Sequence, residues 1–155
     1  MLVIESVKTP QQVEIARTLF LEYADSLGFD LSFQNFEQEL AELPGNYVPP
    51  GGRLYLAFEK GRPAGCIALR KISNEECEMK RFYVCPLFRG KGLGKRLATR
   101  VIEEAREIGY KRMLLDTVPA MKRAISLYRA LGFKPVPPYR KNPVPGASFM
   151  ELNLE

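Results

Sequence analysis

Three glycines at alternate positions lie in the run Arg89-Gly90-Lys91-Gly92-Leu93-Gly94, which is the stretch of this sequence best suited to chemistry. The run follows a strand-like segment that ends at Val84 and opens a helix-like segment that continues to residue 108. Glycine lets a backbone approach an anion closely, and the first N–H groups of a helix lack partners inside the helix. The stretch therefore predicts a phosphate-binding turn between a strand and a helix.

The spacing of these glycines excludes two common nucleotide motifs. It is not Gly-x-Gly-x-x-Gly, and no Gly-Lys-Ser or Gly-Lys-Thr follows, so neither the dinucleotide fingerprint nor the P-loop is present. Lys91, Lys95 and Arg96 add positive charge beside the turn, although a solvated helix face would also explain them. We therefore expect a phosphate-bearing ligand outside those two classes.

The residue types that are absent limit the chemistry further. The chain has no histidine, which excludes Ser-His-Asp and Cys-His catalysis. Cys66, Cys77 and Cys85 have no Cys-x-x-Cys spacing and no basic partner in their expected strands, so we expect no disulfide framework, no metal site and no cysteine nucleophile. A proton acceptor must then be a carboxylate, a tyrosine, a lysine or water.

Alternating and helical apolar patterns indicate the elements that position the glycine run. We expect strands over residues 2–7, 54–59, 64–72, 76–84, 113–118 and 147–154. We expect helices over residues 10–27, 33–43, 93–108 and 120–131. Prolines between residues 135 and 145 predict a segment without regular structure. This order predicts a mixed α/β domain with one sheet flanked by helices.

Length and charge bound the class of protein. With 155 residues, we expect a single domain over residues 1–155. No apolar run reaches the roughly 18 residues of a membrane helix and no secretory signal is visible, so we expect a cytosolic protein without a membrane partner. The net charge is +5, yet residues 1–45 hold eight acidic and two basic side chains. That part would attract a cationic amine, although solvated helix faces explain it equally well.

Two runs together resemble a known family. They are Lys80-Arg81-Phe82-Tyr83-Val84-Cys85-Pro86-Leu87-Phe88-Arg89-Gly90-Lys91-Gly92-Leu93-Gly94 and Ala124-Ile125-Ser126-Leu127-Tyr128-Arg129-Ala130-Leu131-Gly132-Phe133. Their order and separation are similar to those of the GCN5-related N-acetyltransferase (GNAT) superfamily. The resemblance implies a single domain with a mostly antiparallel sheet of six to seven strands, about four flanking helices, and a splay at the strand ending near Val84. It also implies acetyl-CoA-dependent transfer of an acetyl group to a primary amine of a small molecule or peptide, in a ternary complex.

The resemblance also implies how coenzyme A is held. N–H groups of the glycine turn would bind its pyrophosphate, and the preceding strand would lie beside its pantetheine arm. The N–H of Val84 would face the thioester carbonyl and stabilise the negative charge that develops there. The implied cofactor-binding residues are Phe82, Tyr83, Val84, Arg89, Gly90, Lys91, Gly92, Leu93, Gly94 and Lys95.

Two side chains are the implied catalytic residues. Tyr128 matches a tyrosine that hydrogen-bonds the departing sulfur in many members, although its position on an apolar helix stripe would also suit a core residue. Glu78 lies where some members carry a glutamate base, and an unbroken strand would place it on the same face as Val84. Alternatively, Glu78 is a surface residue that pairs with Lys80 or Arg81. In that case a chain of water molecules would act as the base. Met121 replaces an asparagine common in the family, and we interpret it as a packing residue.

Two other functions remain open at this stage. A catalytically inactive acyl-CoA-binding sensor would have the same motifs. Nucleic-acid binding through the basic residues 89–100 is a weaker alternative, because no aromatic stacking platform lies beside them. We therefore expect a small-molecule amine as partner and no nucleic acid. A homodimer is common in the family, but no residue here implies one.

Overall fold

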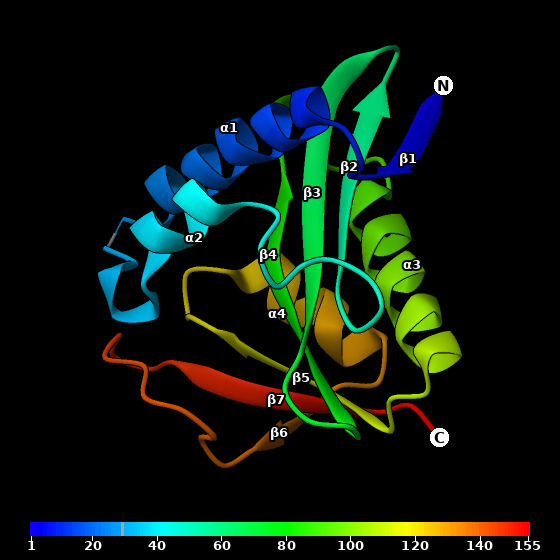
Figure 1. Cartoon of the computed structure of the whole chain (residues 1–155). Coiled ribbons are helices and arrows are strands. Elements are labelled where there is room, and N and C mark those ends of the chain that lie inside the picture. Colours follow the sequence, from blue (N-terminus) through cyan, green and yellow to red (C-terminus); the bar gives the residue numbers. More distant parts are fainter. Residues whose placement is uncertain (29) are drawn as a thin grey trace.

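The computed structural model describes residues 1–28 and 30–155, and its core is one seven-stranded sheet (Figure 1). The strands are β1 (Leu2–Ser6), β2 (Arg53–Glu59), β3 (Arg62–Lys71), β4 (Glu76–Val84), β5 (Arg112–Thr117), β6 (Lys134–Val136) and β7 (Ser148–Asn153). Their order across the sheet is β1-β2-β3-β4-β5-β7-β6. Only the β4–β5 pair is parallel, and every other neighbouring pair is antiparallel. This arrangement confirms the mixed α/β fold expected from the sequence.

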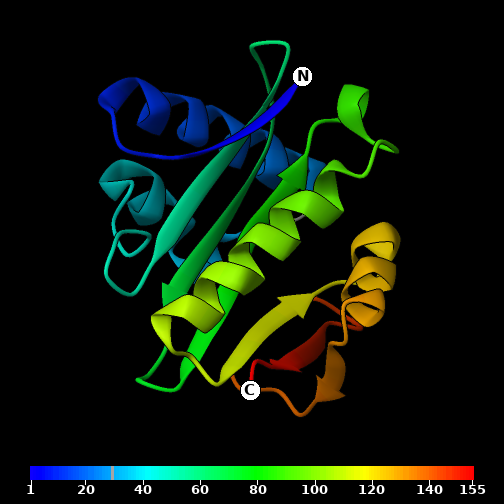
Figure 2. The same ribbon diagram turned by 90° about the vertical axis from the view of Figure 1, so that its right-hand side faces the viewer.

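In the part of the chain that the structure describes, four α-helices cover the two faces of the sheet. They are α1 (Pro10–Leu27), α2 (Phe36–Glu42), α3 (Leu93–Ile108) and α4 (Lys122–Ala130). Buried residues of α1 and α2 form one apolar cluster with β2 and β3, and those of α3 and α4 form another with the opposite face. Figure 2 shows α3 lying across the sheet, with α4 beside the divergent β5 and β7 strands. The sheet is therefore buried on both faces, by α1 and α2 on one side and by α3 and α4 on the other.

Local sequence signals explain the helix ends. Thr9 accepts a hydrogen bond from the Gln12 N–H, and the Gln12 side chain accepts one from the Thr9 N–H, which completes a capping box at the start of α1. Gly28 ends α1 and Gly109 ends α3, both with the left-handed backbone that glycine adopts without steric cost. The sequence predicted both helix ends correctly.

Strand β4 contains a β-bulge. After the bulge, the alternation of side chains between the two faces of the sheet is shifted by one residue. Lys80 pairs with Ala68 and Tyr83 pairs with Cys66, so two residues of β4 lie opposite a single residue of β3. Within the bulge, Arg81 has a φ of 55°, which is unusual for a residue other than glycine. As a result Lys80 and Arg81 both reach toward the α1–α2 layer, whereas Phe82 packs against the α3–α4 core.

The bulge comes just before a splay in the sheet. Strand β5 pairs with β4 only from Glu76 to Glu78, and the remainder of β4 has no β5 partner in the part of the chain that the structure describes. The two strands therefore diverge before Val84, as the family resemblance implied. Below, this opening is called the splay.

The structure differs from the expected elements in two places. The second helix begins at Phe36 rather than at residue 33, because the residues before it form a 3₁₀ turn, Ser32–Gln34. The segment expected to lack regular structure contains the short edge strand β6, which pairs with β7. A proline fits there because an edge strand need not donate a hydrogen bond from every residue.

Over the described residues, none of the helices combines the length and apolar character that crossing a membrane requires.

The Arg81–Glu39 ion pair should be important for stability, because Arg81 is buried at 2% side-chain exposure. Both contacts from Arg81 to the Glu39 carboxylate measure 2.8 Å. Burial acts to lower the pKa of Arg81, and the hydrogen bonds and charge of Glu39 outweigh it and raise the pKa overall. We predict that Glu39→Gln lowers the free energy of unfolding by about 3 kcal/mol, because it leaves a buried charge without its partner. Urea unfolding measures this loss.

The matched control is Glu37→Gln, which removes an exposed carboxylate from the same helix and should change stability by less than about 0.5 kcal/mol. Equal stabilities of the two variants would show that the ion pair does not hold α2 against β4.

Candidate active site

The backbone of Val84 presents a free strand edge inside the splay. The Cys85 N–H donates to the Ala64 carbonyl over 2.8 Å, and Val84 is paired with Gly65. Because backbone groups of successive residues in an antiparallel strand point to opposite sides, the Val84 N–H and C=O point away from β3. The Val84 carbonyl accepts a hydrogen bond of 2.9 Å from Arg89 Nε. An extended ligand could pair with this edge.

The start of α3 is built to attract an anion. Its N-cap residue, Gly92, has a φ of 81°, and no side chain caps the helix. The first turn contains no acidic residue, whereas Lys91, Lys95 and Arg96 are exposed around it. These cations lie beside the positive end of the helix dipole, where positive charge is unfavourable. A bound anion would accept hydrogen bonds from the free N–H groups and would reduce the repulsion between the dipole and the cationic side chains. This geometry supports the phosphate-binding turn predicted from the glycines.

A groove of about 400 Å³ connects the anion-binding turn to the free strand edge. Its lining includes Phe82, Tyr83, Val84, Arg89, Gly90 and Gly94 from the predicted set, opposite the start of α4. At Gly94 an added Cβ would lie 3.2 Å from Phe82 Cζ, so glycine permits the close approach of helix and strand. Of the other predicted residues, Leu93 is buried in the core, and Lys91 lies 5.9 Å from the Phe88 ring. Neither of these two residues, nor Gly92 or Lys95, lines the groove.

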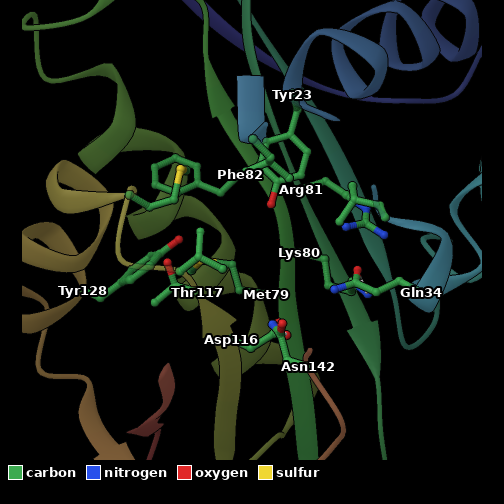
Figure 3. Close-up of a pocket in the computed structure, with 14 residues that line it drawn as sticks. Tyr23, Gln34, Met79, Lys80, Arg81, Phe82, Asp116, Thr117, Tyr128 and Asn142 are labelled. Atoms are coloured by element: carbon green, nitrogen blue, oxygen red, sulfur yellow. Dashed lines mark hydrogen bonds between the residues drawn. The ribbon is translucent and has the colours of Figure 1, made fainter. Parts of the chain in front are cut away.

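A small central cavity of about 50 Å³ occupies the splay between β4 and β5 (Figure 3). Its lining residues are Tyr23, Leu27, Leu31, Gln34, Met79, Lys80, Arg81, Phe82, Asp116, Thr117, Val118, Met121, Tyr128 and Asn142. The cavity and the groove share Leu27, Phe82 and Met121. Met121, interpreted as packing from the sequence, therefore borders both spaces. A ligand that follows the groove along β4 would end at this cavity.

Tyr128 lines the central cavity from α4 while belonging to the core. It is 6% exposed, and its ring centroid lies 6.1 Å from that of Phe82 and 5.6 Å from that of Phe133. Burial raises the pKa of its hydroxyl well above the ordinary value, with smaller contributions from the charges of Tyr23 and Asp116. The hydroxyl therefore stays protonated at neutral pH and can donate a hydrogen bond, while its raised pKa makes it a weaker acid than an exposed tyrosine. The core and catalytic interpretations of Tyr128 are compatible here.

Glu78 is completely buried, which corrects the alternative that it is a surface partner of Lys80 or Arg81. Its Oε1 accepts a 2.6 Å bond from Arg70 Nε, and its Oε2 accepts a 2.6 Å bond from the Tyr139 hydroxyl and contacts Arg140. The bulge that follows Lys80 also breaks the alternation that would have placed Glu78 on the face of Val84. Glu78 does not line the central cavity.

Lys80 is the functional candidate that the sequence analysis treated only as a possible partner of Glu78. It is 9% exposed and its Nζ donates to Gln34 Oε1 over 3.2 Å. Burial, followed by the positive charge of Arg81, lowers the pKa of Lys80 to about 7. A lysine in the middle of a strand that is expected to lie inside the sheet was the available signal.

Asp116 and Asn142 also line the cavity without having been predicted. Asn142 Nδ2 donates to Asp116 Oδ2 over 3.0 Å, which joins β5 to the segment before β7. Figure 3 shows this pair across the cavity from Lys80 and Gln34. The cavity therefore has a carboxylate on one wall and an amine on the other.

A third space, here called the acceptor pocket, opens toward α2 and has a volume of about 360 Å³. It shares Gln34 and Lys80 with the central cavity. The acidic residues that suggested a cationic ligand do not dominate it. Asp25, Asp30, Glu37 and Glu42 are exposed, and Glu39 is paired with Arg81. Their solvated positions favour the alternative that they form ordinary helix faces.

The cysteines provide no activated nucleophile. Cys66 and Cys77 are buried, and burial raises the pKa of both thiols. Cys85 lies just after β4 rather than within a strand, and burial, followed by the nearby Glu22 charge, raises its pKa to about 11. Among the described residues, no group of three or more His, Cys, Asp or Glu side chains could hold a metal ion.

Comparisons with known proteins agree with this geometry. Residues 14–133 match the model of the Acetyltransferase (GNAT) family. An uncharacterized N-acetyltransferase of Schizosaccharomyces pombe is 39% identical over 153 residues, covering 97% of this chain and 94% of that protein. A GNAT-family acetyltransferase from Staphylococcus aureus has the same fold, with a TM-score of 0.83, 21% identity and full coverage of both chains. An acetyltransferase from Salmonella typhimurium, determined with its cofactor acetyl-CoA, has a TM-score of 0.69 and 21% identity over 99% of this chain and 94% of that chain.

The low pKa of Lys80 predicts a distinctive pH dependence of stability. Lysine in an unfolded chain has a pKa of about 10.4, so between pH 7 and 10 the unfolded state binds more protons at this position than the folded state. Stability of the native chain should therefore rise with pH, relative to Lys80→Met, by up to about 1.4 kcal/mol per pH unit in this window. Urea unfolding of both proteins at pH 7, 8 and 9 measures the difference.

Lys111→Met is the control, because Lys111 is half-exposed and pairs with Glu75 at the surface. Parallel pH slopes for the native chain and Lys80→Met would contradict a neutral, buried Lys80.

Proposed function

Because this chain belongs to the Acetyltransferase (GNAT) family, we propose that it transfers an acetyl group from acetyl-CoA directly to the primary amine of a small molecule or peptide. Members of this family are acetyltransferases that use acetyl-CoA, and this supports acetyl transfer by the chain. The acceptor and the mechanism are our inference from the site. The observation that carries the proposal is the free edge at Val84, which joins the anion-binding groove to a cavity containing Tyr128.

The residues of the groove fit coenzyme A. The N–H groups at the start of α3, with Lys91, Lys95 and Arg96 around them, would hold its pyrophosphate. The edge of β4 would hydrogen-bond the pantetheine arm as an added strand, in the manner of β-augmentation. The cofactor supplies an activated acyl carbonyl and a thiolate leaving group. The Val84 N–H would donate to the carbonyl oxygen as negative charge develops on it.

Tyr128 is the proposed proton donor to the departing sulfur. Its hydroxyl lines the central cavity and is kept protonated by burial. A thiol with a pKa of about 8.5 is a good leaving group, so the phenol mainly stabilises the thiolate and then supplies a proton. Tyr128 would therefore raise kcat more than it would tighten cofactor binding.

The proposed proton acceptor is water in the central cavity. A cavity of this size holds at least one water molecule, and Asp116, Lys80 and Gln34 offer it polar partners. Glu78 is less suited to accept the proton, because it does not line the central cavity and its carboxylate is paired with Arg70 and Arg140, which favour its charged form. A water relay is compatible with the buried network around Glu78 remaining intact.

A direct experiment separates acetyl transfer from simple acyl-CoA binding. The purified protein is incubated with acetyl-CoA and a panel of primary amines, and free thiol is measured. We expect amine-dependent thiol release together with a product heavier by one acetyl group. Tight acetyl-CoA binding with no thiol release for any amine would instead support the catalytically inactive sensor.

Removing the Tyr128 hydroxyl should affect turnover selectively. We predict that Tyr128→Phe lowers kcat by about 10²-fold, because the thiolate loses its proton donor while the ring still packs against Phe82 and Phe133. The KM for acetyl-CoA should change by less than about threefold. Steady-state kinetics from pH 6 to 10 measures both quantities.

Tyr110→Phe is the matched control, because the hydroxyl of this buried tyrosine donates to the Gly51 carbonyl outside the site, at 2.7 Å. An unchanged kcat in Tyr128→Phe would remove Tyr128 from the mechanism.

The anion-binding turn should depend on the glycine that precedes α3. Gly92 has a φ of 81°, so Gly92→Ala would strain the turn by about 1 kcal/mol or more and disturb the N–H groups that face the phosphates. We predict a Kd for coenzyme A at least about tenfold higher, measured by isothermal titration calorimetry.

Gly61→Ala provides the same strain elsewhere, because Gly61 has a φ of 77° in the β2–β3 turn and is equally open to an added Cβ. It should lose similar stability and keep its coenzyme A affinity. A similar loss of affinity in both variants would attribute the effect to folding rather than to the turn.

A further inference from the structure

The groove, the central cavity and the acceptor pocket are neighbours around the splay. The groove and the cavity share Phe82 in their linings, and the cavity and the acceptor pocket share Lys80. These two residues of β4 point to opposite layers because the bulge lies between them. A donor in the groove and an acceptor in the pocket would therefore meet at the central cavity from opposite sides of the sheet.

The wall of the acceptor pocket nearest to the cavity is cationic. Arg70, Lys80 and Arg140 all line it, and Glu78 lies buried behind them. Arg70 and Arg140 share the single Glu78 carboxylate, which also accepts a hydrogen bond from Tyr139. Two guanidinium groups thus depend on one carboxylate for charge compensation.

Arg70 and Arg140 stay partly exposed although they share the Glu78 carboxylate. The side chain of Arg70 is 33% exposed and that of Arg140 is 19% exposed. Glu42 also lines the pocket, but it is exposed at the rim, where water screens its charge. An anionic group in the pocket would therefore contact two guanidinium groups that are already held in place by Glu78.

The Arg140 side chain also has hydrogen-bonding capacity beyond Glu78. Its Nη2 atom is buried against the Glu78 carboxylate and forms an ion pair with it. A guanidinium has five N–H donors and matches the two oxygens of a carboxylate, so this contact leaves other donors for a ligand. The pocket therefore offers two arginine side chains on the same wall.

We propose that the acceptor is an amine that also carries a carboxylate, such as an amino acid, and that Arg140 and Arg70 bind this carboxylate in the acceptor pocket. The amine then reaches past Gln34 and Lys80 into the central cavity. This inference rests on the proposed acetyl transfer and narrows its substrate class. In this proposal Arg140 and Arg70 select acceptors that have a carboxylate. Proton transfer takes place in the central cavity and does not involve these two arginines.

The test compares amines that differ only in the carboxylate. Thiol release from acetyl-CoA is measured with L-amino acids, with the corresponding amino-acid amides, and with the corresponding decarboxylated amines. For the best acceptor we expect kcat/KM to be at least about tenfold higher for the acid than for its amide, as loss of a charged hydrogen bond implies. A ratio near one for every pair, with turnover present, would overturn the carboxylate site and leave acetyl transfer standing.

Variants assign the preference to the pocket. Arg140→Gln should reduce the acid-to-amide ratio of kcat/KM at least about tenfold, and Arg140→Lys should restore part of it, because the positive charge returns without the planar fork. Arg53→Gln is the matched control, because Arg53 is a half-buried arginine whose 2.9 Å ion pair with Glu104 lies outside the site, and it should keep the native ratio. Thermal melting checks that each variant is folded. An unchanged ratio in folded Arg140→Gln would overturn the proposal.

A binding measurement decides the question independently of turnover. N-acetylated amino acids are titrated into the coenzyme A complex by calorimetry, since these products retain the carboxylate. We expect binding of at least one acid, weakened at least about tenfold by Arg140→Gln. If no amine supports thiol release, the proposed transfer fails, and these titrations still test the carboxylate site. If none of the acids binds, that site is overturned as well.

Discussion

The backbone turn at Arg81, held by two hydrogen bonds to Glu39, is the constraint on which the rest of the site depends. A non-glycine residue at positive φ costs about 1 kcal/mol or more, and it persists only where surrounding contacts fix it. Here the contacts come from α2, so the helix layer fixes a bulge in the sheet. The bulge sends Lys80 toward one layer and Phe82 toward the other, which allows two ligands to approach one point from opposite sides.

The splay complements that constraint. A strand edge inside a sheet normally has all its hydrogen bonds made, and β4 loses its neighbour after Glu78. The open edge is covered on one side by α3 and α4 and on the other by α1, so it lies in a cleft rather than on the outer surface. An extended pantetheine arm would complete the pairing that β5 leaves unmade. In the proposed function, cofactor binding and catalysis would both depend on this missing strand contact.

How much of this could be read from the sequence depended on how local each signal was. The glycine turn, the ends of α1 and α3 at Gly28 and Gly109, and the order of most elements along the chain were predictable, because glycines, caps and apolar periodicity act within a few residues. The bulge at Arg81 was not, since its partner Glu39 lies 42 positions earlier in the chain. The burial of Glu78 likewise depends on Arg70, Tyr139 and Arg140, which come from two separate segments. Strand β6 was missed because its proline suggested an irregular segment.

Arg89 covers the open edge of β4 and so bears on whether this edge can pair with another chain. Its Nε atom lies 2.9 Å from the Val84 carbonyl, and its guanidinium carbon lies 5.8 Å from the centre of the Tyr83 ring. Exposed strand edges are templates for pairing with other chains, and a charged side chain over the edge is a common defence against aggregation. Arg89 therefore covers this carbonyl while the edge is empty. A cofactor that paired with the same carbonyl would have to displace the Arg89 side chain, so one arginine would both protect the free edge and limit access to it.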